Sequence, residues 1–184
     1  MWVFHCTLKK MEIKNIFQIQ SVKHSIENWK VKKNKFEKDI ENLNFVENQF
    51  ATSRNVKQKI NLNEIFKRNF KKELNLLEKT INNKLILKNV WVVHYRQYQE
   101  HIIHNHGNSG LGGVIYLKYD NKLHEPTRYL MPLNDLVSEN SLIYNEQVEE
   151  GDILVMPSLI HHYSSINRSE EVRSIIGFDL EFVK

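Results

Sequence analysis

The feature that most constrains the fold is a change in the spacing of apolar residues near residue 84. Before it, apolar side chains recur every three or four positions, and after it they recur every second position. The first spacing is typical of an amphipathic helix and the second of a strand with one buried face. The chain is therefore expected to have a mainly helical N-terminal layer, residues 1–83, and a stranded core, residues 84–184.

The clearest predicted helix runs from about Asn63 to Asn82. Asn63 can cap its first turn, and an apolar stripe lies opposite Lys and Glu residues. Residues 21–49 also have helical spacing, residues 50–61 are polar and predict a loop, and residues 11–19 alternate as a short strand does. The stripe consists of Ile65, Phe66, Phe70, Leu74, Leu77 and Ile81.

The stranded core contains several short strands separated by turn signals. Such a series predicts antiparallel strands in a sandwich or barrel. We therefore expect one domain over residues 1–184, of the α+β, mainly β class, in which a jelly-roll barrel is packed against the helical layer. The strands are expected at residues 85–95, 113–119, 127–131, 152–156 and 172–183, with turn signals at Asp120–Asn121, Pro132, Glu150–Asp152 and Asn167.

The composition limits where the protein works. Hydrophobic residues make up 41% and charged residues 26%, which is ordinary for a soluble globular protein. No window approaches the roughly 18 consecutive apolar residues of a membrane span, and the N-terminus lacks the basic region of a secretory signal. One cysteine, Cys6, excludes an intramolecular disulfide. We expect a cytoplasmic protein with no membrane partner.

The charge is unevenly distributed. Residues 1–90 carry 19 Lys and Arg against 9 Asp and Glu, whereas residues 91–184 carry 7 against 13. A basic half can bind nucleic acid or another anion. The lysines alternate with Glu and Asn rather than with Arg and aromatic residues, which favours a solvent-exposed helical face over a nucleic-acid site.

The histidines are clustered, because seven of the nine lie between His94 and His162. His104 and His106 are two residues apart, and residues at this spacing share one face of a strand. Two such imidazoles can occupy adjacent positions on a metal ion, with a third ligand from the segment that ends in His161 and His162. Neutral imidazole suits Fe, Zn, Cu or Ni, so the residues do not choose the metal.

Arg173 is the second chemical signal, because it interrupts an otherwise apolar strand. A guanidinium inside a barrel requires an anionic partner, since an unpaired buried charge is costly. A dicarboxylate would supply that partner through a bidentate interaction. The alternative is that Arg173 points outward to solvent, Glu170 or Glu171.

Together these segments resemble the 2-oxoglutarate- and Fe(II)-dependent oxygenases, specifically those common in tailed phages and marine bacteria. The resemblance implies a double-stranded β-helix barrel and a non-haem dioxygenase of the hydroxylase type, which uses Fe(II), 2-oxoglutarate and O2. It spans residues 88–182 and rests on Trp91–Tyr98, His104–Gly107, Gly113–Leu117, Val148–Ser158, His162 and Arg173–Phe178.

The resemblance also implies the metal ligands. His104 and His162 correspond to two iron ligands, and His161 would then face outward. The superfamily has His-x-Asp or His-x-Glu where this chain has a second histidine. The third ligand is therefore either His106 or a carboxylate such as Asp120.

The co-substrate residues follow in the same way. Arg173 corresponds to the residue that binds the remote carboxylate of 2-oxoglutarate. Tyr116, or Tyr95 on the preceding strand, can add a phenol hydrogen bond to the same carboxylate.

Two other functions remain open. The spacing of Gly151, Pro157 and His162 also resembles the second motif of cupins, which share the barrel and include isomerases and three-histidine dioxygenases. That function needs no 2-oxoglutarate and leaves Arg173 without a partner. A non-catalytic structural barrel is the third hypothesis, but it gives no reason to cluster histidines on inward positions.

Overall fold

Two sheets and two helices form the described part of the protein, residues 18–134 and 137–183 of the computed structural model. The helices are α1 (Trp29–Asp39) and α2 (Leu62–Ile81). The larger sheet has the order β1 (Val22–Ser25), β9 (Asp152–Pro157), β6 (Leu111–Lys118), β11 (Arg173–Phe182), β4 (Leu85–Tyr95), β3 (Ala51–Thr52) and β2 (Val46–Glu47). The smaller sheet has the order β5 (His101–His104), β10 (His162–Ser164), β7 (Thr127–Asn134) and β8 (Ser141–Tyr144).

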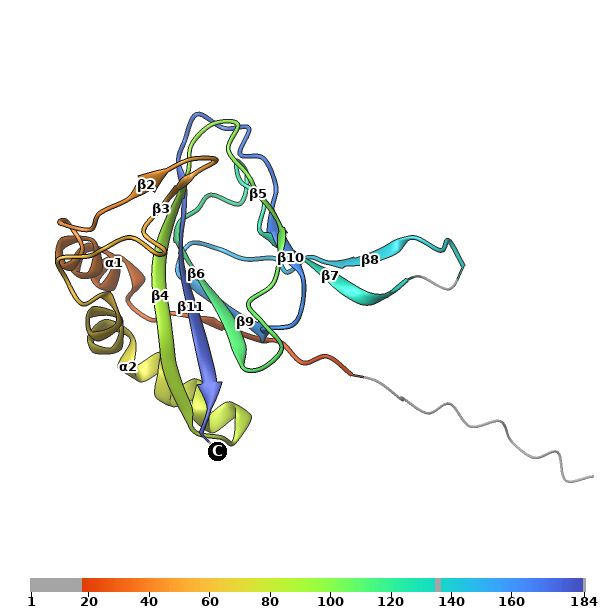
Figure 1. The fold of residues 1–184 in the computed structure, drawn as a ribbon, viewed down its shortest axis with the longest axis horizontal. Coiled ribbons are helices and arrows are strands. Elements are labelled where there is room, and N and C mark those ends of the chain that lie inside the picture. The colour runs from red at the N-terminus through yellow and green to blue at the C-terminus, as the bar shows by residue number, and fades with distance from the viewer. Residues whose placement is uncertain (1–17, 135–136, 184) are drawn as a thin grey trace, which may run out of the picture.

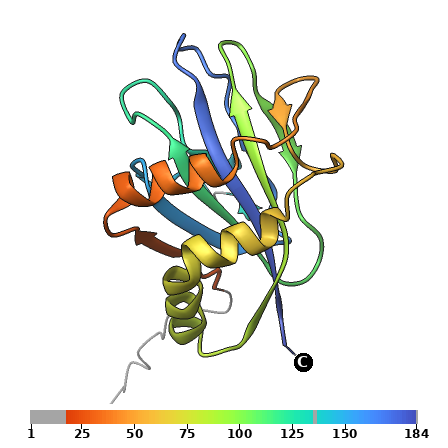
Figure 2. The same cartoon turned by 90° about the vertical axis from the view of Figure 1, so that its left-hand side faces the viewer.

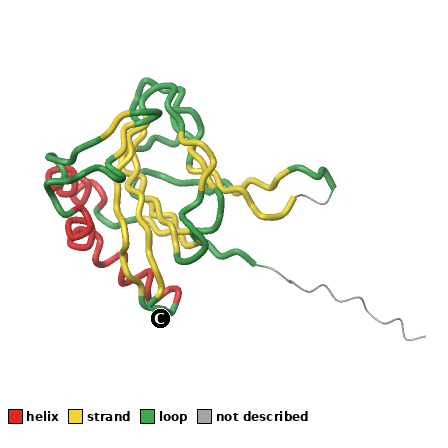
Figure 3. Tube along the Cα trace, in the orientation of Figure 1, coloured by secondary structure: helices red, strands yellow, loops and turns green. Residues whose placement is uncertain are grey.

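The helices lie together on one face of the larger sheet, and the smaller sheet lies on the other face (Figure 1, Figure 2). Colouring by secondary structure separates these layers (Figure 3). Every strand pairing in the described residues is antiparallel. This arrangement confirms the predicted mainly β jelly roll with a helical layer.

Helix α2 confirms the predicted helix with a shift of one residue at each end. Its cap is Asn61, whose side chain accepts a hydrogen bond from the Glu64 backbone N–H at 3.2 Å. The prediction that Asn63 caps the helix is wrong, because Asn63 lies inside the first turn. Its Nδ2 donates instead to the Lys88 carbonyl at 2.9 Å, which ties α2 to β4.

The prediction of continuous helical structure over residues 21–49 is wrong at both ends. Residues 22–25 form β1, because they pair with β9 and become the edge strand of the larger sheet, where Val22 lies opposite Val155. Helix α1 begins only at Trp29, after Asn28 in a left-handed conformation with φ of 54°. Strand β3 interrupts the loop predicted for residues 50–61. The strand predicted for residues 11–19 lies, apart from its last two residues, outside the described residues.

The five predicted strands correspond to β4, β6, β7, β9 and β11. The prediction of a turn at Pro132 is wrong, because this residue lies inside β7. The β7–β8 register shifts between Leu130 and Asn134, so Pro132 falls where the ladder is irregular and its missing N–H costs little. Strands β5, β8 and β10 have four residues or fewer and were not predicted.

Alternation along β11 directs side chains to two separate cores. Ile176 and Phe178 pack toward the helices, where the Phe178 ring lies 5.1 Å from that of Phe66. Ile175 faces the interior between the two sheets, and this interior also contains the candidate site. Neither α1 nor α2 combines the length and the apolar character that a membrane-spanning helix needs.

Candidate metal centre and co-substrate site

Three histidines converge on the interior from the smaller sheet. His104 ends β5, His106 follows it by two residues, and His162 begins β10. In the antiparallel pairing of β10 with β5, His162 lies opposite His104. One ring nitrogen of each histidine lies within 4.8 Å of the other two. These three predicted ligands therefore form one cluster that can hold a metal ion.

Hydrogen bonds fix the ring tautomers of His104 and His162. Nδ1 of His104 lies 2.8 Å from the Ile102 carbonyl oxygen, and Nδ1 of His162 lies 3.1 Å from the Ile160 carbonyl oxygen. A carbonyl oxygen can only accept, so each Nδ1 must carry the proton. The lone pair of each neutral ring is therefore on Nε2, which is free to bind a metal ion.

His106 has the same tautomer for a different reason. Its Nδ1 lies 2.5 Å from Oδ1 of Asp179, a carboxylate on β11. Its Nε2 is buried and has no hydrogen-bond partner among the described residues. A buried nitrogen lone pair without a donor is costly, and a metal ion at this position would satisfy it. The donor set and this unpartnered nitrogen fit a divalent transition metal.

Two of the three rings are held in their uncharged form. Burial, with a smaller contribution from the neighbouring His104 ring, lowers the pKa of His162 to about 3. Burial also lowers the pKa of His104, against the opposing effect of its hydrogen bond to Ile102. Neutral imidazoles are the form that binds metal, so no proton has to leave these two rings at neutral pH.

His101 packs against the cluster through the ring of His104. Its ring is stacked on His104 with centroids 3.9 Å apart, and burial lowers its pKa to about 3. His94 lies elsewhere, with Nδ1 at 2.7 Å from the Ser174 hydroxyl. His161 is exposed, and its Nε2 contacts the Asn105 amide at 3.4 Å. These three histidines are outside the ligand cluster.

Arg173 points into the interior and is only 1% exposed. Its Nη1 donates to the Ser164 hydroxyl at 2.7 Å and its Nη2 to the Thr127 hydroxyl at 3.2 Å, while Nε has no partner in the described part of the chain. Within the described residues no carboxylate forms an ion pair with this guanidinium. An unpaired buried cation is costly, so the position fits an anionic ligand such as a carboxylate.

Tyr95 and Tyr116 form the aromatic walls around Arg173. The guanidinium carbon lies 5.0 Å from the Tyr95 ring centroid and 6.0 Å from that of Tyr116. The Tyr116 hydroxyl accepts the Thr127 backbone N–H at 3.1 Å, which leaves its own proton available to a ligand. Burial raises the pKa of Tyr95, so its phenol stays protonated and can also donate.

The alternative carboxylate ligand considered in the sequence, Asp120, is not part of the cluster formed by His104, His106 and His162. It is exposed, and its Oδ1 accepts the backbone N–H of Lys122 at 2.8 Å. The carboxylate that does approach the cluster is Asp179, which sequence analysis missed. Its position provides a signal, because Asp179 is six residues after Arg173 and an even separation on a strand gives the same face.

Asp179 has two further partners at the rim of the site. Asn89 donates to its Oδ2 at 3.2 Å, and Arg54 lies 3.6 Å from the same oxygen. The Arg54 guanidinium also lies 4.2 Å from the Trp91 ring centroid. Burial alone would raise the pKa of Asp179, but the contacts with His106, Asn89 and Arg54 lower it overall.

Comparison with known proteins agrees with this chemistry. Residues 89–179 of the 184-residue chain match the family described as "Putative 2OG-Fe(II) oxygenase". This match covers all three clustered histidines, Arg173 and Asp179. No curated protein sequence matches the chain.

Solved structures share the fold at low sequence identity. An oxidoreductase of the 2OG-Fe(II) oxygenase family from Burkholderia pseudomallei has a TM-score of 0.68 and 8% identity over 88% of this chain and 84% of that one. HygX from Streptomyces hygroscopicus, with nickel, 2-oxoglutarate and hygromycin B bound, has a TM-score of 0.61 and 14% identity over 89% and 82%. The viral collagen prolyl hydroxylase vCPH from Paramecium Bursaria Chlorella virus-1 has a TM-score of 0.52 and 12% identity over 88% and 96%.

These structures establish the double-stranded β-helix fold, and the family match adds the chemistry. The half-buried histidine cluster and the unpaired Arg173 are consistent with both. Residues 89–179, which contain the histidine cluster and Arg173, belong to the 2-oxoglutarate- and Fe(II)-dependent oxygenase family.

Proposed function

We propose that His104, His106 and His162 hold the Fe(II) ion of this oxygenase through their Nε2 atoms. The observation that supports this assignment is the shared tautomer. All three Nδ1 atoms lie within 3.1 Å of an oxygen acceptor, which leaves three Nε2 lone pairs for one ion. Three neutral ligands on one side leave positions open for co-substrate and O2.

Arg173 is proposed to bind the remote carboxylate of 2-oxoglutarate. Ser164 and Thr127 hold its two terminal nitrogens, so the guanidinium is oriented before any ligand arrives. Tyr95 and Tyr116 enclose it and can each offer a phenol proton to the same carboxylate. An oriented, buried cation binds a carboxylate more strongly than an exposed one, because less reorganisation is needed.

When bound, iron and 2-oxoglutarate would supply the oxidising chemistry: 2-oxoglutarate would lose CO2 and take one oxygen atom of O2 to become succinate, and the other oxygen atom would oxidise the prime substrate. The protein contributes the arrangement of groups. Its histidines would hold the metal, its arginine would orient the co-substrate, and the Tyr95 and Tyr116 rings would enclose that arginine. A cupin-type function is less well supported, because it provides no anion for Arg173.

The direct test is anaerobic titration of the Fe(II)-loaded protein with 2-oxoglutarate, followed by visible absorption. We expect a weak, saturable metal-to-ligand charge-transfer band, which forms only when 2-oxoglutarate chelates the iron. Stoichiometric iron without the band would favour the cupin-type function. Failure to take up iron would contradict the ligand assignment.

A further inference from the structure

Asp179, a carboxylate on β11, contacts the His106 ring at Nδ1, on the side away from the Nε2 atom proposed to bind the metal. The distance from Oδ1 to Nδ1 is 2.5 Å, shorter than either backbone hydrogen bond made by His104 or His162. Asp179 does not belong to the group of side chains whose ligand atoms converge. Its position is therefore suited to act on the metal through the imidazole.

The charge of the ligand set explains why this contact matters. Two histidines and one carboxylate reduce the charge of a bound Fe(II) by one unit, whereas three neutral imidazoles leave it unchanged. A carboxylate that accepts the Nδ1 proton of a ligating imidazole makes Nε2 a stronger donor. Charge is then transferred to the metal without a carboxylate ligand.

We propose that Asp179 supplies, through His106, the negative charge that a carboxylate ligand would otherwise place directly on the iron. The inference rests on the proposed function, because it requires His106 to bind the metal. Asp179 is then a positioning residue that orients the His106 ring and strengthens its donation to the metal. It acts on the metal only through His106. The centre then keeps the overall charge of a two-histidine, one-carboxylate site. Its carboxylate is hydrogen-bonded to a ligand instead of being bound to the metal.

The surroundings of Asp179 favour this role. Asn89 donates to its other oxygen at 3.2 Å, so the carboxylate is held at a fixed orientation toward His106. Arg54 is 3.6 Å from that same oxygen and its side chain is 35% exposed, so its interaction is longer and more screened than the contact with the imidazole. The shortest contact of the carboxylate is therefore the one between its Oδ1 and Nδ1 of His106, a proposed metal ligand.

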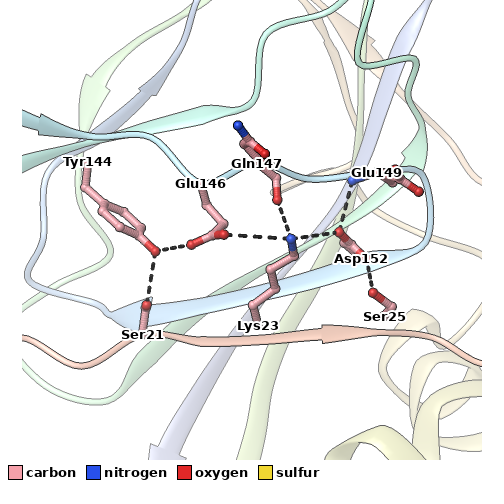
Figure 4. Close-up of polar contacts among 8 residues, drawn as sticks. All are labelled: Ser21, Lys23, Ser25, Tyr144, Glu146, Gln147, Glu149 and Asp152. Carbon is pink, nitrogen blue, oxygen red and sulfur yellow. Dashed lines mark hydrogen bonds and ion pairs between the residues drawn. The ribbon is translucent and has the colours of Figure 1, made fainter.

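The test compares Asp179→Asn with Asp179→Ala. Asparagine keeps an oxygen acceptor for Nδ1 but removes the charge, and alanine removes both. Asn89 can turn its amide to accommodate the new side chain. The matched control is Asp152→Asn, because Asp152 is another carboxylate on the larger sheet. Asp152 belongs to a separate polar network, where it contacts Ser25, Lys23 and the Glu149 backbone (Figure 4).

Two properties are measured under anaerobic conditions: the Fe(II) dissociation constant and the energy of the charge-transfer band with 2-oxoglutarate. We expect Asp179→Asn to weaken Fe(II) binding by roughly ten- to hundred-fold. The band should move to shorter wavelength, because an iron with less electron donation is harder to oxidise. Asp179→Ala should weaken binding further, and Asp152→Asn should leave both properties unchanged. A purely structural role would not move the band.

A measurement on the unmutated protein covers the case in which the variants fail to fold. In the Co(II)-substituted protein, the Nδ1 protons of the three bound imidazoles should give three shifted exchangeable proton signals. The one bonded to a carboxylate should differ from the two bonded to carbonyls. Three equivalent signals, or an Asp179→Asn protein with unchanged iron affinity and an unchanged band, would overturn the inference while leaving the proposed function intact. Absence of Fe(II) binding by the unmutated protein would overturn both.

Discussion

His162 lies directly opposite His104 in the antiparallel pairing of β10 with β5, with ring centroids 4.4 Å apart. Directly opposed residues on one face of a sheet are close neighbours, so two strands that are distant in sequence supply adjacent ligands. His106, two residues after His104, completes the cluster. The proposed metal centre therefore depends on the pairing of two very short strands.

Replacing His162 with alanine should abolish Fe(II) binding. The remaining two imidazoles do not form a complete facial set, and His161 cannot replace the lost ring because it is exposed. Metal analysis after dialysis and circular dichroism would measure iron content and folding. His161→Ala is the matched control and should retain iron. Full iron stoichiometry in His162→Ala would refute the ligand assignment.

Replacing Arg173 with alanine should weaken 2-oxoglutarate binding without displacing the metal. Loss of one partner of a buried charge pair costs about 2 kcal/mol or more, which is roughly thirty-fold in Kd. The charge-transfer titration gives this Kd, and metal analysis gives the iron content. Arg128→Ala on β7 is the control, because Arg128 pairs with Glu125. An unchanged Kd for Arg173→Ala would remove this residue from the co-substrate site.

Replacing Gly177 with alanine should destabilise the fold beside the metal centre. A Cβ at this position would lie 2.4 Å from the Trp91 ring, and Trp91 is the residue that pairs with Gly177 across β11 and β4. Overpacking of this kind costs about 1–3 kcal/mol. Urea unfolding followed by circular dichroism would measure the loss.

Gly112→Ala is the matched control for that experiment. The nearest atom to its added Cβ would be Nδ1 of His106 at 3.6 Å, an ordinary van der Waals distance. Its free energy of unfolding should change much less than that of Gly177→Ala. Equal stability of the two variants would show that the Trp91 ring can move aside without cost.

His94 should make the metal-free protein less stable in mild acid. Burial, followed by the positive charge of Lys118, lowers its pKa below the ordinary value of 6.5. The unfolded chain therefore binds a proton that the folded chain resists, and the free energy of unfolding falls as the pH decreases below about 6.5. The contribution of His94 to the free energy of unfolding is fully present only above that pH.

The variant His94→Gln isolates this contribution, because glutamine does not titrate. Urea midpoints of the metal-free proteins would be compared at about pH 7.5 and about pH 5.5. We expect the unmutated protein to lose more stability between these values than His94→Gln does. An equal loss in both proteins would contradict the assignment of acid sensitivity to His94.

Local patterns in the sequence predicted the elements that have strong periodicity. The apolar stripe that begins at Ile65 predicted α2 within one residue at each end, and the alternation through Trp91 and Tyr95 predicted β4. The histidine pair, His162 and Arg173 were identified by residue type and spacing. These features depend on neighbouring positions in the chain, which a sequence displays directly.

Tertiary structure decided what depends on distant partners. Strands β1, β5 and β10 are too short to have a recognisable pattern, and they exist because they pair with β9 and with each other. The approach of Asp179 to His106 is of the same kind, because 73 residues separate the two side chains in sequence. The sequence determined which residues carry chemistry, whereas the sheet pairing decided which acid lies beside which base, since only the folded chain brings β11 against the histidines.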